Sequence, residues 1–290
     1  MKRIHAIGLT ILTAVLAVGA AFAQKPAPLA QNAALRYWAA FSELQDAAIS
    51  DQDAKDLNAA LDTMGPLDFS KFKDLIQKNT PALETMARGT SLPNCDWGLD
   101  YSLGEETPVE YARKALMLGR LNLLYVIQQY HSGNRDGAIR SLGAGVRFAH
   151  DVGNGGSLFA TLVAKDLLML HLMAVGDGVK MGQLSPQQLS QLQNAVAAVG
   201  DGLDWPAAAR RDLEALRTNY AKDQQASTAL NRIVAAYTAF LNDPSKLPAL
   251  TEAIHSAPPE LGNVIPNPKR VLEQKQELVE KIHQTRGMLR

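Results

Sequence analysis

Signals for the start of a helix recur along this chain, and they constrain its fold more than any other feature. Thr107-Pro108-Val109-Glu110 places a capping threonine before a proline at the first helical position and a glutamate at the third. Ser185-Pro186-Gln187-Gln188 repeats this pattern. Proline also follows a potential cap at Thr80-Pro81 and at Asn267-Pro268. Further N-caps are expected at Asn134, Ser157 and Asp204.

The segments between these signals are rich in Ala and Leu, and none alternates apolar and polar residues in the way that a strand does. The pattern predicts about ten helices, over residues 32–48, 51–64, 70–79, 81–88, 108–131, 135–151, 157–176, 186–199, 206–241 and 268–286. Because residues 221–227 are mostly polar, we expect 206–241 to form two packing segments joined by an exposed middle, with a break near Asp223. We interpret this as an all-α array of antiparallel helical hairpins without a sheet, either a compact bundle or a short curved stack. One domain is expected over residues 24–290. Its last helix, 268–286, would dock back after a proline-rich connection.

Residues 1–23 have the three parts of a secretory signal peptide. Met1-Lys2-Arg3 is a basic start, an apolar stretch runs from Ile4 to Ala20, and Ala21-Phe22-Ala23 is a small-residue cleavage motif. We expect cleavage after Ala23 and a protein exported to the periplasm or beyond. The alternative is an uncleaved anchor, because a bilayer span needs about 20 apolar residues.

The balance of charge excludes some partners. Removing Lys2 and Arg3 from the 29 Lys and Arg leaves a net charge of −2 against 29 Asp and Glu. A chain this close to neutral has no electrostatic attraction to nucleic acid or to anionic lipid. Metal-binding spacings, phosphate loops and nucleophile elbows are missing from the sequence, so it assigns no cofactor, no metal ligand and no catalytic residue.

Residues 121–154 have a recognisable helix–turn–helix pattern. Small residues at Gly133, Ala138 and Gly145, with Leu142 between them, resemble the second half of a tetratricopeptide repeat, in which small positions let two helices pack closely. The resemblance covers this one hairpin and implies helical-hairpin packing. A Tyr-Trp pair in the first helix is also similar to that of exported bacterial proteins of unknown function, from which no activity carries over.

The loop from Ser91 to Tyr101 combines a cysteine, aromatic residues and acidic residues. One interpretation is that Trp97 fills a gap between helices while Cys95, the single cysteine, is buried as a small apolar group. The alternatives are a ligand-contacting lip at Trp97 and a disulfide between two chains through Cys95. We expect burial of Cys95.

The stretch from Leu158 to Val175 is apolar apart from Thr161, Lys165, Asp166 and His171, which predicts a central, buried helix. Lys165 and Asp166 lie about 100° apart on such a helix, so both cannot easily avoid the core. A buried carboxylate needs a partner. We therefore expect Asp166 to accept hydrogen bonds from Arg120 or Arg147, and His171 to be a core or cleft histidine with a satisfied hydrogen bond.

Two functional hypotheses follow. In the first, the chain is a non-enzymatic interaction or scaffold protein whose helical groove holds a peptide or protein partner, an idea that rests on fold analogy. In the second, it is a small-molecule binder or an enzyme with a pocket near Trp97, Asp166 and His171, and with Arg120 and Arg147 as further ligand contacts. The shape of the cavity and the convergence of ionisable groups discriminate between them.

Overall fold

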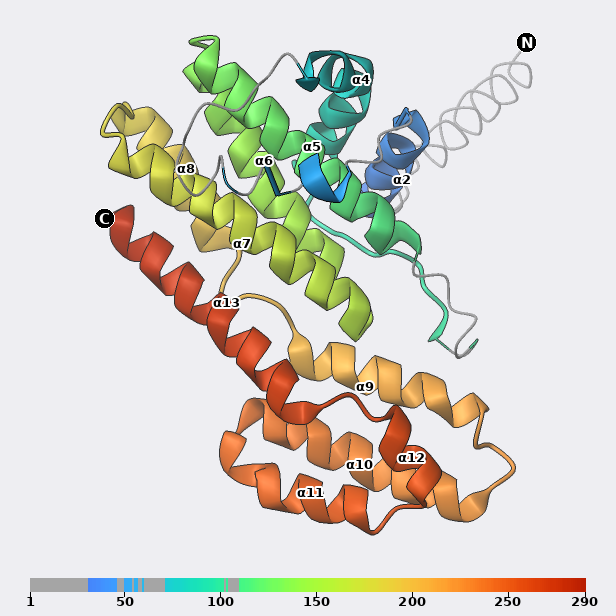
Figure 1. Ribbon diagram of the computed structural model, residues 1–290. Coiled ribbons are helices and arrows are strands. Elements are labelled where there is room, and N and C mark those ends of the chain that lie inside the picture. The colour runs from blue at the N-terminus through green and yellow to red at the C-terminus, as the bar shows by residue number, and fades with distance from the viewer. Residues whose placement is uncertain are drawn as a thin grey trace, which may run out of the picture.

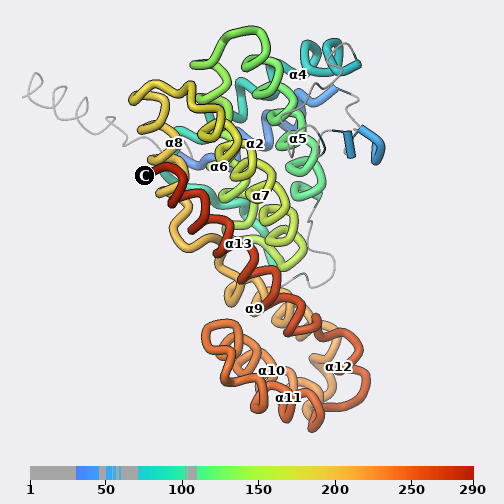
Figure 2. Tube along the Cα trace, turned by 60° about the vertical axis from the view of Figure 1, so that its left-hand side comes forward, coloured from blue at the N-terminus to red at the C-terminus, as the bar shows by residue number. Residues whose placement is uncertain are grey.

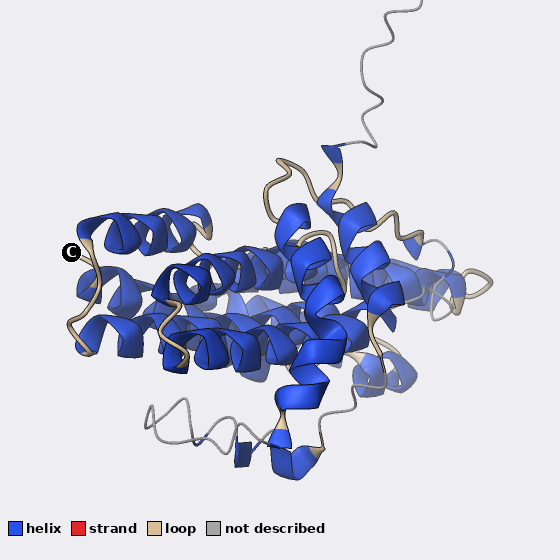
Figure 3. Ribbon diagram, turned by 90° about the horizontal axis from the view of Figure 1, so that it is seen from above, coloured by secondary structure: helices blue, strands red, loops and turns tan. Residues whose placement is uncertain are grey.

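The computed structural model describes residues 31–45, 50–53, 55, 56, 59, 71–101, 103 and 110–290. Within these residues the chain forms eleven α-helices and no β-strand, which confirms the all-α prediction (Figure 3). The helices are α2 (Ala33–Glu43), α4 (Lys73–Gly89), α5 (Glu110–His131), α6 (Arg135–Gly153), α7 (Leu158–Lys180), α8 (Pro186–Ala198), α9 (Trp205–Ala215), α10 (Gln224–Asn242), α11 (Leu247–His255), α12 (Pro259–Val264) and α13 (Pro268–Met288). The predicted signal segment 1–23 and most of the predicted helix 51–64 lie outside the described residues.

Helices α5, α6 and α7 form the centre of the larger group of helices (Figure 1). Helices α2 and α4 pack on one side of this centre, and α8 and α13 pack against α6 and α7. The close approach of α6 to α7 depends on Gly145. A Cβ atom there would lie 2.1 Å from Nε2 of His171 and 2.5 Å from Nδ2 of Asn122. The residue at this position must therefore be glycine for the three helices to meet as they do.

Helices α9 to α12 form a second group beside the first (Figure 2). Helix α10 packs against α9 and α11, and the Tyr237 hydroxyl donates a 3.1 Å hydrogen bond to the carbonyl of Pro266. Helix α13 then runs back along α7 and α8, where Nζ of Lys165 lies 2.7 Å from Oε2 of Glu277. The last helix thus ties the two groups together.

Most of the sequence-based helix starts are confirmed. The side chains of Asn134, Ser157, Ser185, Asp204 and Asn267 each accept a hydrogen bond from a backbone N–H in the first turn. At Ser185 the full capping box is present, because the Gln188 side chain also accepts from the Ser185 N–H. The start predicted at Thr107 lies outside the described residues, where Glu110 is the first described residue of α5.

One predicted helix start is wrong, and two helices were not predicted. Pro81 does not start a helix but lies inside α4, where its ring is exposed to solvent and the Thr80 hydroxyl donates to the carbonyl of Ile76. Helix α11 and the short α12 were both missed, the latter inside the connection that was expected to be irregular. Prolines at the first turn of each support these helices rather than interrupting them.

The predicted long segment 206–241 behaves as its polar middle suggests. Helix α9 ends at Ala215 and α10 begins at Gln224, with Asp223 as the N-cap of α10. Residues 221–225 between the two packed segments are exposed. This confirms a break near Asp223.

Candidate functional site

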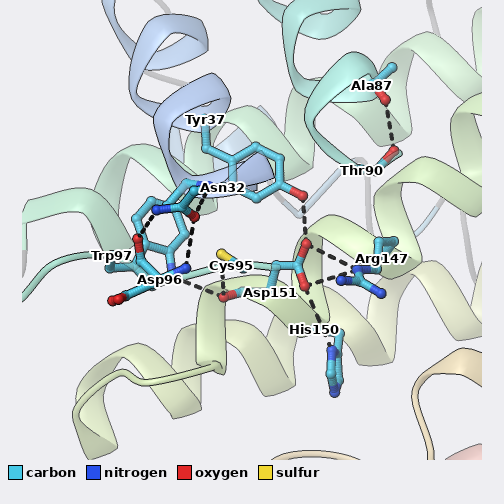
Figure 4. A network of polar contacts seen from close by, with 11 residues as sticks. Asn32, Tyr37, Ala87, Thr90, Cys95, Asp96, Trp97, Arg147, His150 and Asp151 are labelled. Carbon is cyan, nitrogen blue, oxygen red and sulfur yellow. Dashed lines mark hydrogen bonds and ion pairs between the residues drawn. The ribbon is translucent and has the colours of Figure 1, made fainter. Parts of the chain in front are cut away.

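A buried carboxylate at the end of α6 is the centre of a network of polar contacts (Figure 4). Asp151 is completely buried, and its Oδ2 accepts a 2.7 Å hydrogen bond from the Tyr37 hydroxyl of α2. One turn earlier on α6, Nε of Arg147 lies 2.9 Å from Oδ1 and 3.1 Å from Oδ2. The neutral donor therefore joins this carboxylate to α2, and the charged donor pairs with it within α6.

The backbone carbonyl of Asp151 holds the loop that follows α4. It accepts a 2.9 Å hydrogen bond from Nε1 of Trp97 and a 3.7 Å contact from Sγ of Cys95. The same loop is fixed at its neighbouring residue, because Asn32 and Asp96 exchange two hydrogen bonds of 2.7 and 2.8 Å. The loop is thus tied to α2 and α6 at three consecutive residues.

Trp97 is packed between aromatic side chains rather than presented to solvent. Its ring stacks on Tyr111 with centroids 4.2 Å apart and on Phe41 at 6.0 Å, and it is 5% exposed. Of the interpretations considered for this loop, the geometry favours Trp97 filling a gap between helices.

Cys95 is largely buried beside this cluster. Burial raises the pKa of its thiol, and the nearby Asp151 carboxylate raises it further. A thiol in such surroundings stays protonated at neutral pH and is a weak nucleophile. His150, whose Nδ1 lies 3.9 Å from Oδ1 of Asp151, contacts the carboxylate rather than the sulfur in this network. The cluster is arranged for packing and not for thiol chemistry.

The expectation that Asp166 is buried and held by Arg120 or Arg147 is wrong. The Asp166 side chain is 63% exposed, and its ion-pair contact is a 3.8 Å approach to its neighbour Lys165. Partial desolvation raises the pKa of Asp166, while the charges of Lys165 and Arg120 oppose this rise without an ion pair from Arg120. Arg147 instead pairs with Asp151.

The physical reason is that α7 is not buried all round. Its outer stripe, which includes Phe159, Leu162 and Asp166, is exposed, and the 100° step between residues turns Lys165 inward instead. Lys165 is 8% exposed and finds its anion on α13. By length and composition α7 could cross a membrane, but 67% of its most apolar stretch is buried within the bundle.

His171 lies in the core with both ring nitrogens occupied. Nδ1 is 2.7 Å from the carbonyl of Leu167, and Nε2 is 3.2 Å from Nδ2 of Asn122. Nδ2 of Asn122 also donates to the carbonyl of Ser141 at 3.0 Å. Because both carbonyls can only accept, Nδ1 carries the proton and Nε2 accepts from the amide. Burial lowers the pKa of His171 to about 4, so the ring is neutral near pH 7.

Asn122 forms part of the wall of an open groove between α4, α5 and α6. The groove has a volume of about 250 Å³ and is lined by Thr80, Leu83, Glu84, Ala87, Asn122, Tyr125, Asn134, Gly137, Arg140 and Ser141. The lining positions recur every three or four residues on α4 and on α6, so each helix offers one continuous face. Seven of these ten residues are polar, which distinguishes the groove from the buried Asp151 cluster.

Two other hollows are less polar. One, of about 320 Å³, lies between α10 and α13 and is lined mainly by apolar side chains and the stem of Lys275, whose Nζ donates to the carbonyl of Leu241. The other, of about 30 Å³, lies among α5, α6 and α7 beside the buried Tyr130 hydroxyl. A volume of this size holds about one or two water molecules.

The three residues of the predicted pocket have different surroundings. Trp97 belongs to the aromatic cluster, Asp166 faces solvent on α7, and His171 lies behind the wall of the groove. In the described part of the chain, no three His, Cys, Asp or Glu side chains gather as metal ligands would. Comparison with known proteins adds no candidate, because no family model, no curated protein and no solved structure matches this chain.

Sequence reasoning missed Asp151, Asn122 and the groove itself. The sequence did contain a signal for Asp151. Arg147 and Asp151 are four residues apart on an apolar helix, which is the spacing of a helical ion pair. Asn122 stood out as the polar residue in the run Leu121-Asn122-Leu123-Leu124. The groove had no local signal, because its three faces come from segments far apart in the sequence.

Proposed function

We propose that this chain is an exported, non-enzymatic interaction protein, and that the groove between α4, α5 and α6 holds a short peptide segment of its partner. The observation that carries the proposal is the groove itself, which is open, is lined by faces of three helices and includes polar as well as apolar side chains. Its volume of about 250 Å³ lies just below the usual range of ligand pockets, about 300–1,000 Å³, and suits a short segment better than a whole helix.

The use of the buried ionisable groups supports binding over catalysis. The side chains of Tyr37 and Arg147 both bind the carboxylate of Asp151, and the backbone carbonyl of Asp151 anchors the loop. A general acid or base must reach a substrate proton within hydrogen-bond distance. None of these three side chains lines the groove. The alternative of an enzyme centred on Trp97, Asp166 and His171 gains no support, since these three side chains lie in different places and do not line one pocket.

The test is peptide binding with a variant that fills the groove. Ala87 is exposed and lines the groove, so Ala87→Phe should occupy it without disturbing the core. Ala235→Phe is the matched control, because Ala235 is an exposed helical alanine on α10. On an array of random heptapeptides we expect one class of sequences to bind the unmodified protein and the control. The same class should bind Ala87→Phe at least tenfold more weakly.

Equal binding by both variants, or no peptide binding at all, would overturn the proposed function. Export has its own test, which is N-terminal sequencing of the protein recovered outside the cytoplasm. We expect the sequence to begin at Gln24. A chain that keeps Met1 in a membrane fraction would show that the apolar start is an anchor.

A further inference from the structure

The groove carries one side chain of each charge on opposite walls. Glu84 lies on the α4 wall and Arg140 on the α6 wall, and no ion pair joins them. Glu84 is 64% exposed and approaches Arg88 at 4.0 Å, a contact worth little at a surface. Arg140 forms neither an ion pair nor a hydrogen bond with any residue in the part of the chain that the structure describes. Within the described residues, two opposite charges therefore face one groove without pairing with each other.

The wall between them carries several polar groups. Tyr125 of α5 and Ser141 of α6 line the groove and add hydroxyl groups. Asn122 is only 2% exposed, and its amide hydrogens are held by the Ser141 carbonyl and by His171. Its Oδ1 is left as an acceptor. Because the Ser141 carbonyl and His171 fix the orientation of this amide, the position of its Oδ1 acceptor is already set.

We infer that the groove selects a zwitterionic ligand, one that carries a cation and an anion a few bonds apart. A cation alone would lie beside Arg140, and an anion alone would lie beside Glu84, so each would meet a like charge. A neutral ligand would remove water from both charges without replacing it. A zwitterion pairs with both walls, with its anion on the planar guanidinium of Arg140 and its cation on Glu84.

This inference rests on the proposed function and adds the chemistry of the bound segment. The same chemistry has two sources, a peptide segment with neighbouring basic and acidic side chains and a free amino acid. The groove is neutral as a whole, so selection arises from the placement of the two charges and not from attraction at long range. Binding should accordingly weaken as salt is added, since both charged walls are open to solvent.

The experiment measures dissociation constants by titration calorimetry for the full protein and three variants. The probes are acetylated and amidated hexapeptides that contain a Lys–Glu pair, the same peptides with Met–Gln in its place, and a panel of free amino acids. Arg140→Glu and Glu84→Arg each put like charges on both walls. The double variant reverses the two charges, and a zwitterion can turn around to fit it.

We expect the Lys–Glu peptides to bind the unmodified protein at least tenfold more tightly than the Met–Gln peptides, as a pair of charge-assisted hydrogen bonds implies. Each single variant should lose that preference and the double variant should regain it. Stronger binding of free amino acids than of any peptide would support the zwitterion but overturn the peptide partner. If both peptide sets bind equally and Ala87→Phe abolishes the binding of both, this inference is overturned and the proposed function stands. Absence of groove binding would overturn both.

Discussion

The hydroxyl of Tyr37 donates a 2.7 Å hydrogen bond to Oδ2 of Asp151, a residue 114 positions further along the chain. Both side chains are completely buried. This contact fixes α2 against the end of α6, where the loop containing Trp97 is also anchored. Burial and the neighbouring carboxylate both raise the pKa of Tyr37, so the phenol remains a donor at every physiological pH.

Tyr37→Phe should lower the free energy of unfolding by about 1–3 kcal/mol, because the buried carboxylate loses a donor that water cannot replace. Urea unfolding followed by circular dichroism measures this difference. Tyr220→Phe is the control, since Tyr220 lies in the partly exposed segment between α9 and α10. Its effect should stay within about 0.5 kcal/mol. Equal stability of Tyr37→Phe and the unmodified protein would contradict the role given to this bond.

Asp151→Ala should destabilise far more than Asp166→Ala. The first change leaves Arg147 without its anion, and Arg147 is 30% exposed, so we expect the lower end of the penalty for breaking a buried pair, about 3 kcal/mol. Asp166 faces solvent, and its removal should change stability by at most about 0.5 kcal/mol. Thermal and urea denaturation of both variants decide the point. The reverse order would mean that the carboxylate supporting the core had been assigned to the wrong residue.

His171 should make the protein less stable in acid. Burial lowers the pKa of His171 to about 4, below the value of 6.5 that it has when unfolded, so the unfolded chain takes up the proton first. Its contribution to stability is present above pH 6.5 and is lost as the pH falls towards 4. The full loss is about 3 kcal/mol. A series of urea denaturations across this range, compared with His171→Gln, isolates the effect.

Asp212 should change the free energy of unfolding in the opposite direction over the same pH range. Burial raises its pKa to about 6, although the N–H of Leu158 and the charge of Arg211 both lower it. Its stabilising contribution is present below pH 3.8 and is lost as the pH rises through 6, again by about 3 kcal/mol. In the unmodified protein the two effects largely cancel. As the pH rises from 4 to 6.5, the free energy of unfolding of Asp212→Asn should increase and that of His171→Gln should decrease. Parallel profiles for the two variants would refute both assignments.

The two partners of the ion pair between α7 and α13 should respond differently to removal, because Lys165 is buried and Glu277 is half-exposed. Glu277→Ala leaves the buried Lys165 ammonium with only the longer 3.8 Å contact to the exposed Asp166 and should destabilise by about 1–3 kcal/mol. Lys165→Met with Glu277 intact should be neutral or stabilising, because Glu277 is half-exposed and can be hydrated. Amide exchange in α13 reports the docking of this helix. Faster exchange in Lys165→Met than in Glu277→Ala would contradict this prediction.

Much of the fold could be predicted because its signals are local. A capping side chain and the N–H that it binds are three residues apart, so Ser157, Ser185 and Asp204 identify helix starts without knowledge of the rest of the chain. The break before Asp223 was visible for the same reason. Pro81 shows the limit, since proline at a first turn and an exposed proline within a helix look alike in the sequence.

The candidate site could not be predicted because its residues meet only through tertiary contacts. Composition marked α7 as apolar but did not say which of Lys165 and Asp166 faces inward, a choice made by the position of Glu277 on α13. In the same way, the importance of Asp151 depends on Tyr37, and the groove depends on the packing of α4 against α5 and α6. None of these partners lies within one helical turn of the residue concerned.

Chemical-shift mapping of the backbone amides during a peptide titration tests the central claim most directly. The Lys–Glu hexapeptide is added to the ¹⁵N-labelled protein, and the shift of each amide is followed. We predict that the largest changes fall in residues 80–87, 122–125 and 137–141, which line the groove, and that Ala87→Phe abolishes them. Changes centred instead on the exposed side chains of Trp38 and Phe159, with the groove amides unmoved, would contradict the account.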